Sequence, residues 1–224
     1  MTQARWTWRE ALGMVVLGVF LLGLLMPAMG ERSVSRRMQN QSQLRGIHQA
    51  MVMYSTDNGG YYPGLASDGS VGEIDVESRF RLLLERNFFA GDYLINPNER
   101  KTVWTAGALT SDNYSYAMLQ VPDAGGRREE WRETMNADAI VISDRNTGTV
   151  ANPEGVMTGL PRRGSGCAWR SYRGWAGAVV FNDNRAEIVE THVHDTVYGG
   201  VATADDHIFE AAGDDDAYMV HAGN

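Results

Sequence analysis

The chain has 224 residues, of which 43% are hydrophobic and 21% are charged, and this composition excludes wholesale disorder. The net charge is −8, and much of the acid lies late in the chain, at Asp205, Asp206 and Asp214–Asp216. Because phosphate binding needs clustered cations, this balance argues against nucleic acid as a partner. The one cysteine, Cys167, excludes an intramolecular disulfide and leaves the cellular compartment open.

The first predicted element is an apolar helix over Ala11–Met29, which carries no charged residue. At 1.5 Å per residue this segment spans ~28 Å, close to the thickness of the hydrocarbon core of a bilayer. Arg5 and Arg9 precede it and predict a cytoplasmic N-terminus, a single pass and a C-terminal domain on the far side of the membrane, which is the periplasm if this is a bacterial inner membrane. The alternative is a cleaved signal peptide, because Ala28-Met29-Gly30 is a small-x-small cleavage site.

The helical pattern continues beyond the apolar segment. Apolar residues at 3-4-3 spacing form one stripe, which consists of Leu44, Ile47, Met51 and Tyr54. Arg45, His48 and Gln49 fall off this stripe and are expected to face solvent. The following Asp-Asn-Gly-Gly sequence is a typical helix stop, so we expect one long helix from Thr7 to Thr56.

The rest of the chain alternates predicted elements with polar loops. A second helix is expected over Ser78–Phe89. Four strands are expected, over Tyr114–Leu119, Ala139–Ser143, Ala178–Phe181 and Ala186–Thr191. The last two flank Asn182-Asp183-Asn184 and predict a hairpin. The segment from Tyr198 onward, rich in small and acidic residues, is expected to be a surface extension.

The start of the apolar segment has a distinctive sequence. The run Trp6-Thr7-Trp8-Arg9-Glu10-Ala11-Leu12 is followed by the apolar segment and Pro27. This N-terminus resembles that of type IV pilins and of the pseudopilins of type II secretion, which begin with an aromatic residue and Thr-Leu-x-Glu-Leu-Leu and then have an apolar stretch and a proline. Counted from Trp6, the positions of Thr7, Glu10 and Pro27 match this pattern without a gap. We expect Pro27 to kink the helix.

The residues from Arg36 to Pro63 are similar to one pseudopilin-like branch, which reads RRMQCxNNLKQIGLALHNYxxxxGxFP. The segment Gly174–Ile188 resembles the branch's C-terminal GGANVLFADGHVxF, with Asp183-Asn184 in place of Asp-Gly. Tyr172 and Arg173 stand near the branch's upstream histidine, and Asn96-Pro97 stands where relatives often carry Cys-Pro. The chain is thus similar to a diverged member of the branch.

The resemblance implies an α+β, pilin-like fold, with a long N-terminal helix packed on an antiparallel sheet. It also implies that Glu10 pairs with the free amino terminus of a neighbouring subunit. Arg5, however, stands where the family has the glycine at which prepilin peptidase cuts. If the leader stays attached, Glu10 instead lies beside Arg9 near a helix N-terminus, where negative charge is favoured.

Two groups of residues are candidate metal ligands. His192-Val193-His194-Asp195 places two imidazoles on one face of a strand, a two-ligand arrangement suited to zinc, with Asp205, Asp206 and His207 near in sequence. The carboxylates of Asp214–Asp216 suit calcium, although they lack EF-hand spacing. For each group, an ordinary structural role, as a strand end or as an acidic loop, is a better explanation than metal binding. We therefore expect no cofactor.

No nucleophile with a matching base and no phosphate-binding loop is apparent, so we expect no enzymatic activity. Cys167 lies in a glycine-rich loop without a catalytic signature, and Asp144-Arg145 is expected to be an ion pair at a strand end.

The predicted protein is a membrane-anchored structural component that contacts other pseudopilins or secretion or pilus assembly components. The alternative is an exported soluble domain, either binding or enzymatic. The expected division is a leader (1–5), a transmembrane half-helix (6–29), an amphipathic half-helix (30–56), a globular domain (57–197) and an acidic tail (198–224).

Overall fold

The computed structural model describes residues 8–121, 128, 131–133, 136–163, 169–211 and 217–222. At residues 10, 22–33, 161–163, 169 and 170 it describes the backbone alone. The chain forms two compact units, Met1–Arg36 and Arg37–Asn224. The second unit contains all the strands found among the described residues, and its architecture is α+β, as expected from the sequence.

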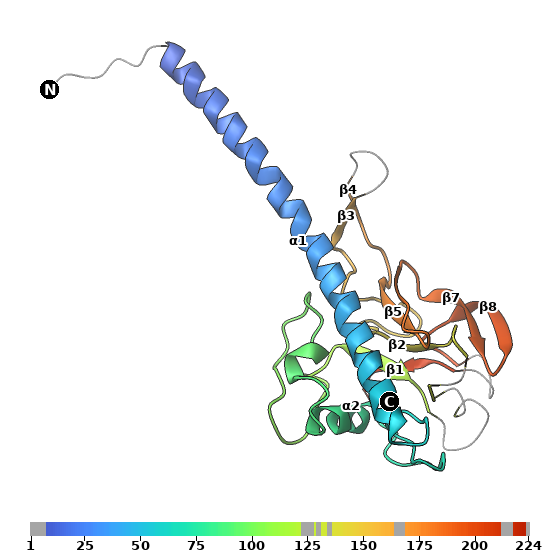
Figure 1. Cartoon of the computed structure of the whole chain (residues 1–224). Coiled ribbons are helices and arrows are strands. Elements are labelled where there is room, and N and C mark those ends of the chain that lie inside the picture. Colours follow the sequence, from blue (N-terminus) through green and yellow to red (C-terminus); the bar gives the residue numbers. More distant parts are fainter. Residues whose placement is uncertain are drawn as a thin grey trace. The chain divides into compact units, whose positions relative to one another are not determined.

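Helix α1 extends from Trp8 to Thr56 (Figure 1), and its C-terminal end is the one that the sequence predicts. The predicted start at Thr7 lies outside the described residues. In the first unit the large apolar side chains described between Trp8 and Leu21 are exposed by half or more. Within the described residues, no helix is both long enough and apolar enough to cross a membrane.

The second unit is built on an antiparallel sheet of five strands in the order β6-β5-β2-β1-β9. Their bounds are Ala186–Val189 (β6), Gly177–Phe181 (β5), Ile140–Asp144 (β2), Tyr116–Leu119 (β1) and Met219–Val220 (β9). Two separate strand pairs, β3 (Pro161–Arg163) with β4 (Trp169–Ser171) and β7 (Val193–Tyr198) with β8 (Val201–His207), accompany it. The other helices are α2 (Val76–Glu85) and the 3₁₀ helix η1 (Gly91–Leu94).

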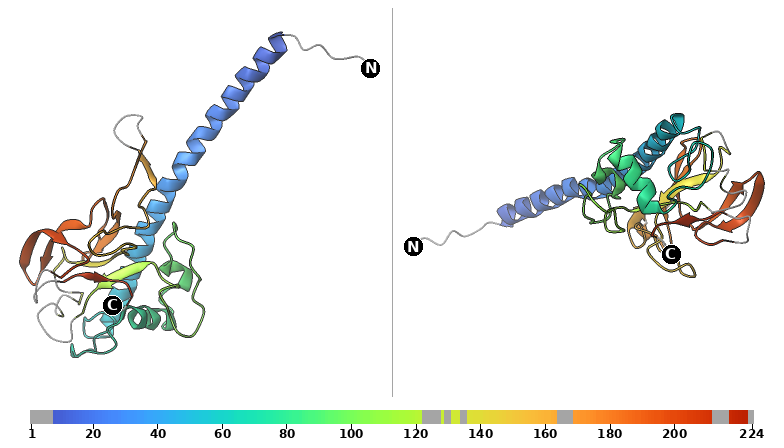
Figure 2. Two further views of the ribbon diagram at one scale, coloured as in Figure 1. Left: turned by 180° about the vertical axis from the view of Figure 1, so that it is seen from behind. Right: turned by 90° about the horizontal axis from the view of Figure 1, so that it is seen from below.

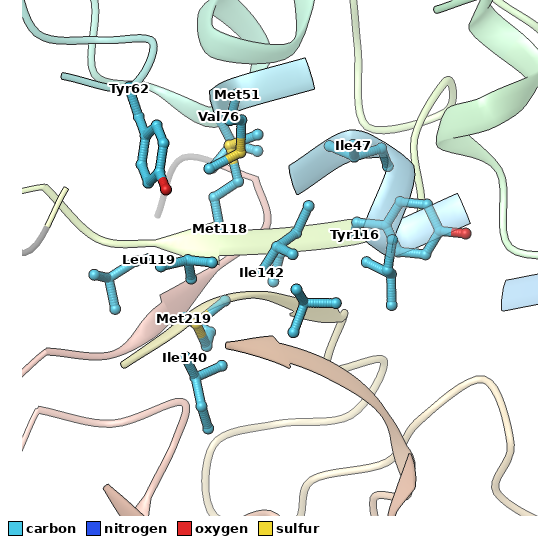
Figure 3. Packing of buried hydrophobic residues seen from close by; sticks show 14 of the residues in the cluster. Ile47, Met51, Tyr62, Val76, Tyr116, Met118, Leu119, Ile140, Ile142 and Met219 are labelled. Carbon is cyan, nitrogen blue, oxygen red and sulfur yellow. The ribbon is translucent and has the colours of Figure 1, made fainter. Parts of the chain in front are cut away.

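The predicted stripe of α1 packs on this sheet. Its four residues, Leu44, Ile47, Met51 and Tyr54, are all buried in the main hydrophobic core. Residues directly opposite each other in a sheet share a face, which places Met118 and Ile142 on one face. Figure 3 shows Met51 close to Met118 on this face of the sheet. The helix is therefore attached by a periodic apolar stripe that the sequence already displays.

Helix α2 begins and ends earlier than the predicted Ser78–Phe89. Asp75 caps its N-terminus, because its side chain accepts a hydrogen bond from the backbone N–H of Ser78. At the other end Asn87 has a φ of 57°, in the left-handed region, and the N–H of Phe88 bonds back to Leu83. This is a typical helix-terminating geometry, and it leaves Phe88 outside the helix.

The expectation of a surface extension after Tyr198 is wrong for the described residues. Strand β8 pairs with β7, and β9 adds to the main sheet beside β1. Figure 2 shows this red C-terminal segment packed against the domain. Ile208, Phe209 and Met219 are buried in the main core, so the described part of this segment contributes to the domain core.

The predicted hairpin between β5 and β6 is confirmed. The two strands pair antiparallel, with Val180 opposite Ala186. Asn184 has a φ of 65°, and its N–H donates to the carbonyl of Phe181. Asparagine tolerates this left-handed conformation better than most residues, so the turn forms without a glycine.

Candidate functional site

Two buried polar clusters lie where α1 crosses the sheet. The first, the Asp144 cluster, consists of Asp144, Asn40, Asn96, Tyr116 and the backbone N–H of Ala178. The second, the His48 cluster, consists of His48, Tyr62, Asn182 and Asn184. Each cluster joins a polar side chain of α1 to strands or turns far away in sequence. Polar groups in such a position must be hydrogen-bonded, because an unpaired buried donor or acceptor is costly.

Asp144, at the end of β2, has no solvent-exposed surface. Its Oδ1 accepts from Asn96 Nδ2 at 2.7 Å and from Asn40 Nδ2 at 3.1 Å. Its Oδ2 accepts from the Ala178 N–H at 2.7 Å and from the same Asn40 nitrogen at 2.8 Å. Burial raises the pKa of this carboxyl to about 6, against the opposing effect of these hydrogen bonds. In its ionised form the carboxylate accepts all four of these hydrogen bonds.

Tyr116 extends this cluster by donating from its hydroxyl to Asn40 Oδ1 at 3.0 Å. The predicted ion pair between Asp144 and Arg145 is not formed. Arg145 bonds instead to Glu99, with its Nε 3.1 Å from Oε1. Consecutive strand residues point to opposite faces, so Asp144 faces α1 while Arg145 turns to a different neighbour. Through hydrogen bonds to one carboxylate, the cluster therefore connects β2, which carries Asp144, to α1, to β5 and to the loop that contains Asn96.

His48 is buried, with 1% of its surface exposed, and the prediction that it faces solvent is wrong. Its Nδ1 lies 3.2 Å from Asn184 Oδ1, and its Nε2 lies 3.2 Å from the Tyr62 hydroxyl. Tyr62 donates to Asn182 Oδ1 at 2.6 Å. The ring therefore connects α1 to the β5–β6 turn. His48 is four residues after Leu44, so the buried face of the helix is wider than the apolar stripe alone.

The His48 cluster makes stability depend on pH. Burial lowers the pKa of the imidazole below its usual value, although the hydrogen bonds to Asn182 and Asn184 oppose this. Below pH ~6.5 the unfolded chain therefore binds a proton that the folded protein accepts less readily. The His48 contribution is fully present above that pH and is lost as the pH falls.

We expect the free energy of unfolding to fall more steeply between pH 7 and 5 in the wild type than in His48→Gln. Denaturant titrations at a series of pH values measure both slopes. The difference in slope between the two proteins reports the contribution of His48 alone. Asp144 is present in both, and its raised pKa makes stability change with pH in the opposite direction in this range. Equal slopes would show that His48 titrates as it does in the unfolded chain.

The structure describes little of the prepilin-type motif. Arg5, Trp6 and Thr7 are outside the described residues, and only the backbone is described at Glu10 and Pro27. That backbone is helical at both positions. Their roles in processing and assembly therefore stay predictions.

The predicted metal ligands are only partly brought together. The ring of His192 packs against His207, with 4.5 Å between centroids, whereas His194 lies 6.0 Å from Phe181. Asp195 accepts a hydrogen bond from the Asp205 N–H. Among the described residues, no group of three or more His, Cys, Asp or Glu side chains is arranged to hold a metal ion. Asp214–Asp216 and Cys167 lie outside the described part of the chain.

Sequence reasoning did not identify the residues that make the two clusters. Asn40 lies four residues before Leu44 and thus continues the stripe. A polar residue at a position that periodicity predicts to be buried is a signal for a buried partner. Asn96 and Asn182 give no such signal, because they lie in turns whose burial depends on distant segments.

Comparison of the chain with protein-family models, curated proteins and solved structures finds no match in any of the three.

Proposed function

We propose that this chain is a pseudopilin-like structural protein, anchored in the inner membrane by Ala11–Met29 with its α+β domain in the periplasm. It works by contact with other pseudopilins or with secretion or pilus assembly components, and it catalyses no reaction. The observation that carries the proposal is the 49-residue helix α1. Its apolar first part is followed by a stripe that packs on an antiparallel sheet, as the resemblance implies.

The Asp144 cluster gives further support. In the pseudopilin-like branch a cysteine follows Arg-Arg-Met-Gln, where this chain has Asn40, and another precedes proline, where this chain has Asn96. The side chains of Asn40 and Asn96 meet on the same oxygen of Asp144. Two positions that depart together from the family pattern are thus neighbours in space, although 56 residues separate them in the chain (96 − 40). This is the arrangement expected if a pair of contacting residues was replaced as a unit.

The His48 cluster supports the same reading. Its partners Asn182 and Asn184 flank Asp183, in the turn that takes the place of the branch's Asp-Gly. The resemblance covers the N-terminal helix and this turn as two separate segments. In the structure the two segments are joined by hydrogen bonds between His48 and the turn. This contact favours a single family resemblance over two chance similarities.

The anchor can be tested by washing membranes of an expressing Gram-negative host with alkaline carbonate. We expect the wild type to stay in the membrane pellet. Leu17→Arg places a charge in the middle of the apolar segment, at a cost to insertion of roughly 2.5–3.5 kcal/mol, and should shift protein to the soluble fraction. Met53→Arg, at an exposed position of the same helix, should behave as the wild type.

Recovery of wild-type protein in the soluble fraction would overturn the anchor. Mass spectrometry of the intact chain then identifies the cause. A chain that begins at Glu31 has been released by signal peptidase at Ala28-Met29-Gly30 and supports the exported soluble domain instead.

A further inference from the structure

We propose that the outer edge of β8 binds an extended basic segment of a partner protein, which adds to the β7–β8 hairpin as a third strand. The residues that carry this inference belong to the second unit, so it goes beyond the proposed function and does not depend on the membrane anchor. Strand β8 is the longest of the described strands, and among these it pairs with β7 alone. Figure 1 shows the hairpin at the periphery of the domain, with β8 on its outer side.

The register of the hairpin shows which backbone groups of β8 remain available. The turn Gly199-Gly200 has a φ of 58° and 78°, and in such a two-residue turn the flanking residues Tyr198 and Val201 exchange both ladder hydrogen bonds. These pairs alternate along an antiparallel ladder, so the N–H and C=O groups of Ala202, and of Ala204 two residues on, point away from β7. Among the described residues, neither alanine forms a backbone hydrogen bond with a segment outside the strand pair.

The side chains along this edge leave room for an incoming strand. Val201, Ala202 and Ala204 are exposed, and Val201 has 60% of its surface accessible. Natural proteins usually protect an unpaired edge with lysine, proline or a bulge. Strand β8 has no lysine and no proline, and its irregularity comes only at Asp205, where φ is 52°. The open edge is therefore Val201–Ala204.

Charge indicates the chemistry of the occupant. Residues 186–224 include nine acidic residues and neither lysine nor arginine. Residues 1–185 hold all 20 basic residues and the other 19 acidic ones (28 − 9), so the negative excess of the chain lies entirely after residue 185. Asp195 and Asp205 are exposed, and the Asp205 N–H donates to Asp195 Oδ1 at 3.0 Å. The described ion pairs include neither of them, so two carboxylates stand at the end of the open edge without a cation.

The same charge disfavours a second copy of this chain as the occupant. Antiparallel pairing of two β8 edges would bring Asp195 and Asp205 of both copies into one sheet, where like charges repel. An extended basic segment avoids this repulsion. Its main chain pairs with Ala202 and Ala204, which gives affinity, and its arginine or lysine side chains approach the two carboxylates, which gives specificity.

The test titrates the full-length chain, purified in a neutral detergent, into a fluorescent peptide in which arginine alternates with valine. Fluorescence anisotropy measures Kd. We expect saturable binding that weakens as salt is added. A peptide of the same sequence with alternate backbone nitrogens methylated keeps its charge but loses the ladder donors on one edge, and it should bind about tenfold more weakly. A peptide with glutamate in place of arginine should show no binding.

Matched variants locate the contact on β8. Ala202→Pro removes an N–H that the β7–β8 pair does not use and should weaken binding about tenfold, whereas Ala202→Val keeps that N–H and should bind as the wild type. Asp195→Asn/Asp205→Asn should weaken binding about twofold for each charge removed. Asp57→Asn/Asp138→Asn removes the same charge at exposed positions elsewhere and should leave Kd unchanged.

Equal affinity for the methylated and unmethylated peptides would reduce the contact to charge attraction and overturn the inference, and this comparison holds even if Ala202→Pro fails to fold. Absence of binding to the wild type would overturn it as well. Self-association of the chain that Ala202→Pro abolishes would assign the edge to a second copy, contrary to the inference. None of these outcomes bears on the anchor, which the carbonate wash tests separately.

Discussion

Asp144→Ala is expected to lower the free energy of unfolding by about 3 kcal/mol. The substitution leaves Asn40 Nδ2, Asn96 Nδ2 and the Ala178 N–H without their acceptor in a place that water does not reach. Each unpaired buried donor costs about 1–3 kcal/mol. Relief of the buried charge, which raises the pKa of Asp144, offsets part of that sum. Chemical denaturation at neutral pH measures the difference.

Asp138→Ala is the matched control. Asp138 is an exposed carboxylate that pairs with Arg185, and its removal should cost about 0.5 kcal/mol or less. Asp144→Asn should fall between the two, because it keeps the shape but turns an NH₂ group toward surrounding donors. If Asp144→Ala is no less stable than Asp138→Ala, the cluster does not hold α1 to the sheet.

The Asp144 cluster fixes the position of α1 along the sheet. An apolar stripe such as that of Leu44, Ile47 and Met51 can slide along a sheet at a modest cost, since hydrophobic contact is not directional. Asn40 and His48 cannot slide, because each has hydrogen-bond partners at one place only. The proposed assembly function, in which the protein presents surfaces to neighbours, would require the long helix to be fixed in one register. The two clusters supply that constraint at two places along α1.

Local patterns predicted the elements whose signals are local. The stripe beginning at Leu44 predicted the buried face of α1, and the glycines after Thr56 predicted its end. The turn at Asn184 predicted the β5–β6 hairpin. In each case periodicity or turn chemistry acts within a few residues, and the tertiary structure agrees with it.

The sequence did not predict the elements whose structure depends on contacts with segments far away in the chain. The residues of β8, Val201–His207, carry little apolar alternation, and they become a strand by pairing with β7. The two residues of β9 form a strand only because they lie beside Met118 and Leu119. Asn96 is buried by the approach of Asp144 from β2. Such burial is a property of the assembled core, and single-sequence reasoning does not contain it.

The processing site is expected to be controlled by Arg5. If the resemblance holds, prepilin peptidase needs the glycine that precedes the aromatic residue in the family, because a side chain there obstructs close approach to the backbone. We expect the wild-type chain, co-expressed with such a peptidase, to keep its first five residues. Arg5→Gly should be cut to a chain that begins at Trp6. Intact-mass spectrometry of purified protein distinguishes the two without ambiguity.

Ala4→Gly controls for added flexibility next to the site and should remain uncut. Cutting of the wild type at Trp6, or an uncut Arg5→Gly chain, would contradict the role given to Arg5. The consequence for assembly follows from Glu10. Cutting creates an amino group at Trp6 that a neighbour's Glu10 can neutralise, and a carboxylate at the edge of an apolar segment is costly without such a partner. Glu10→Gln should therefore impair self-association of the cut Arg5→Gly chain, while the uncut wild type, in which that amine is never formed, should be indifferent to it.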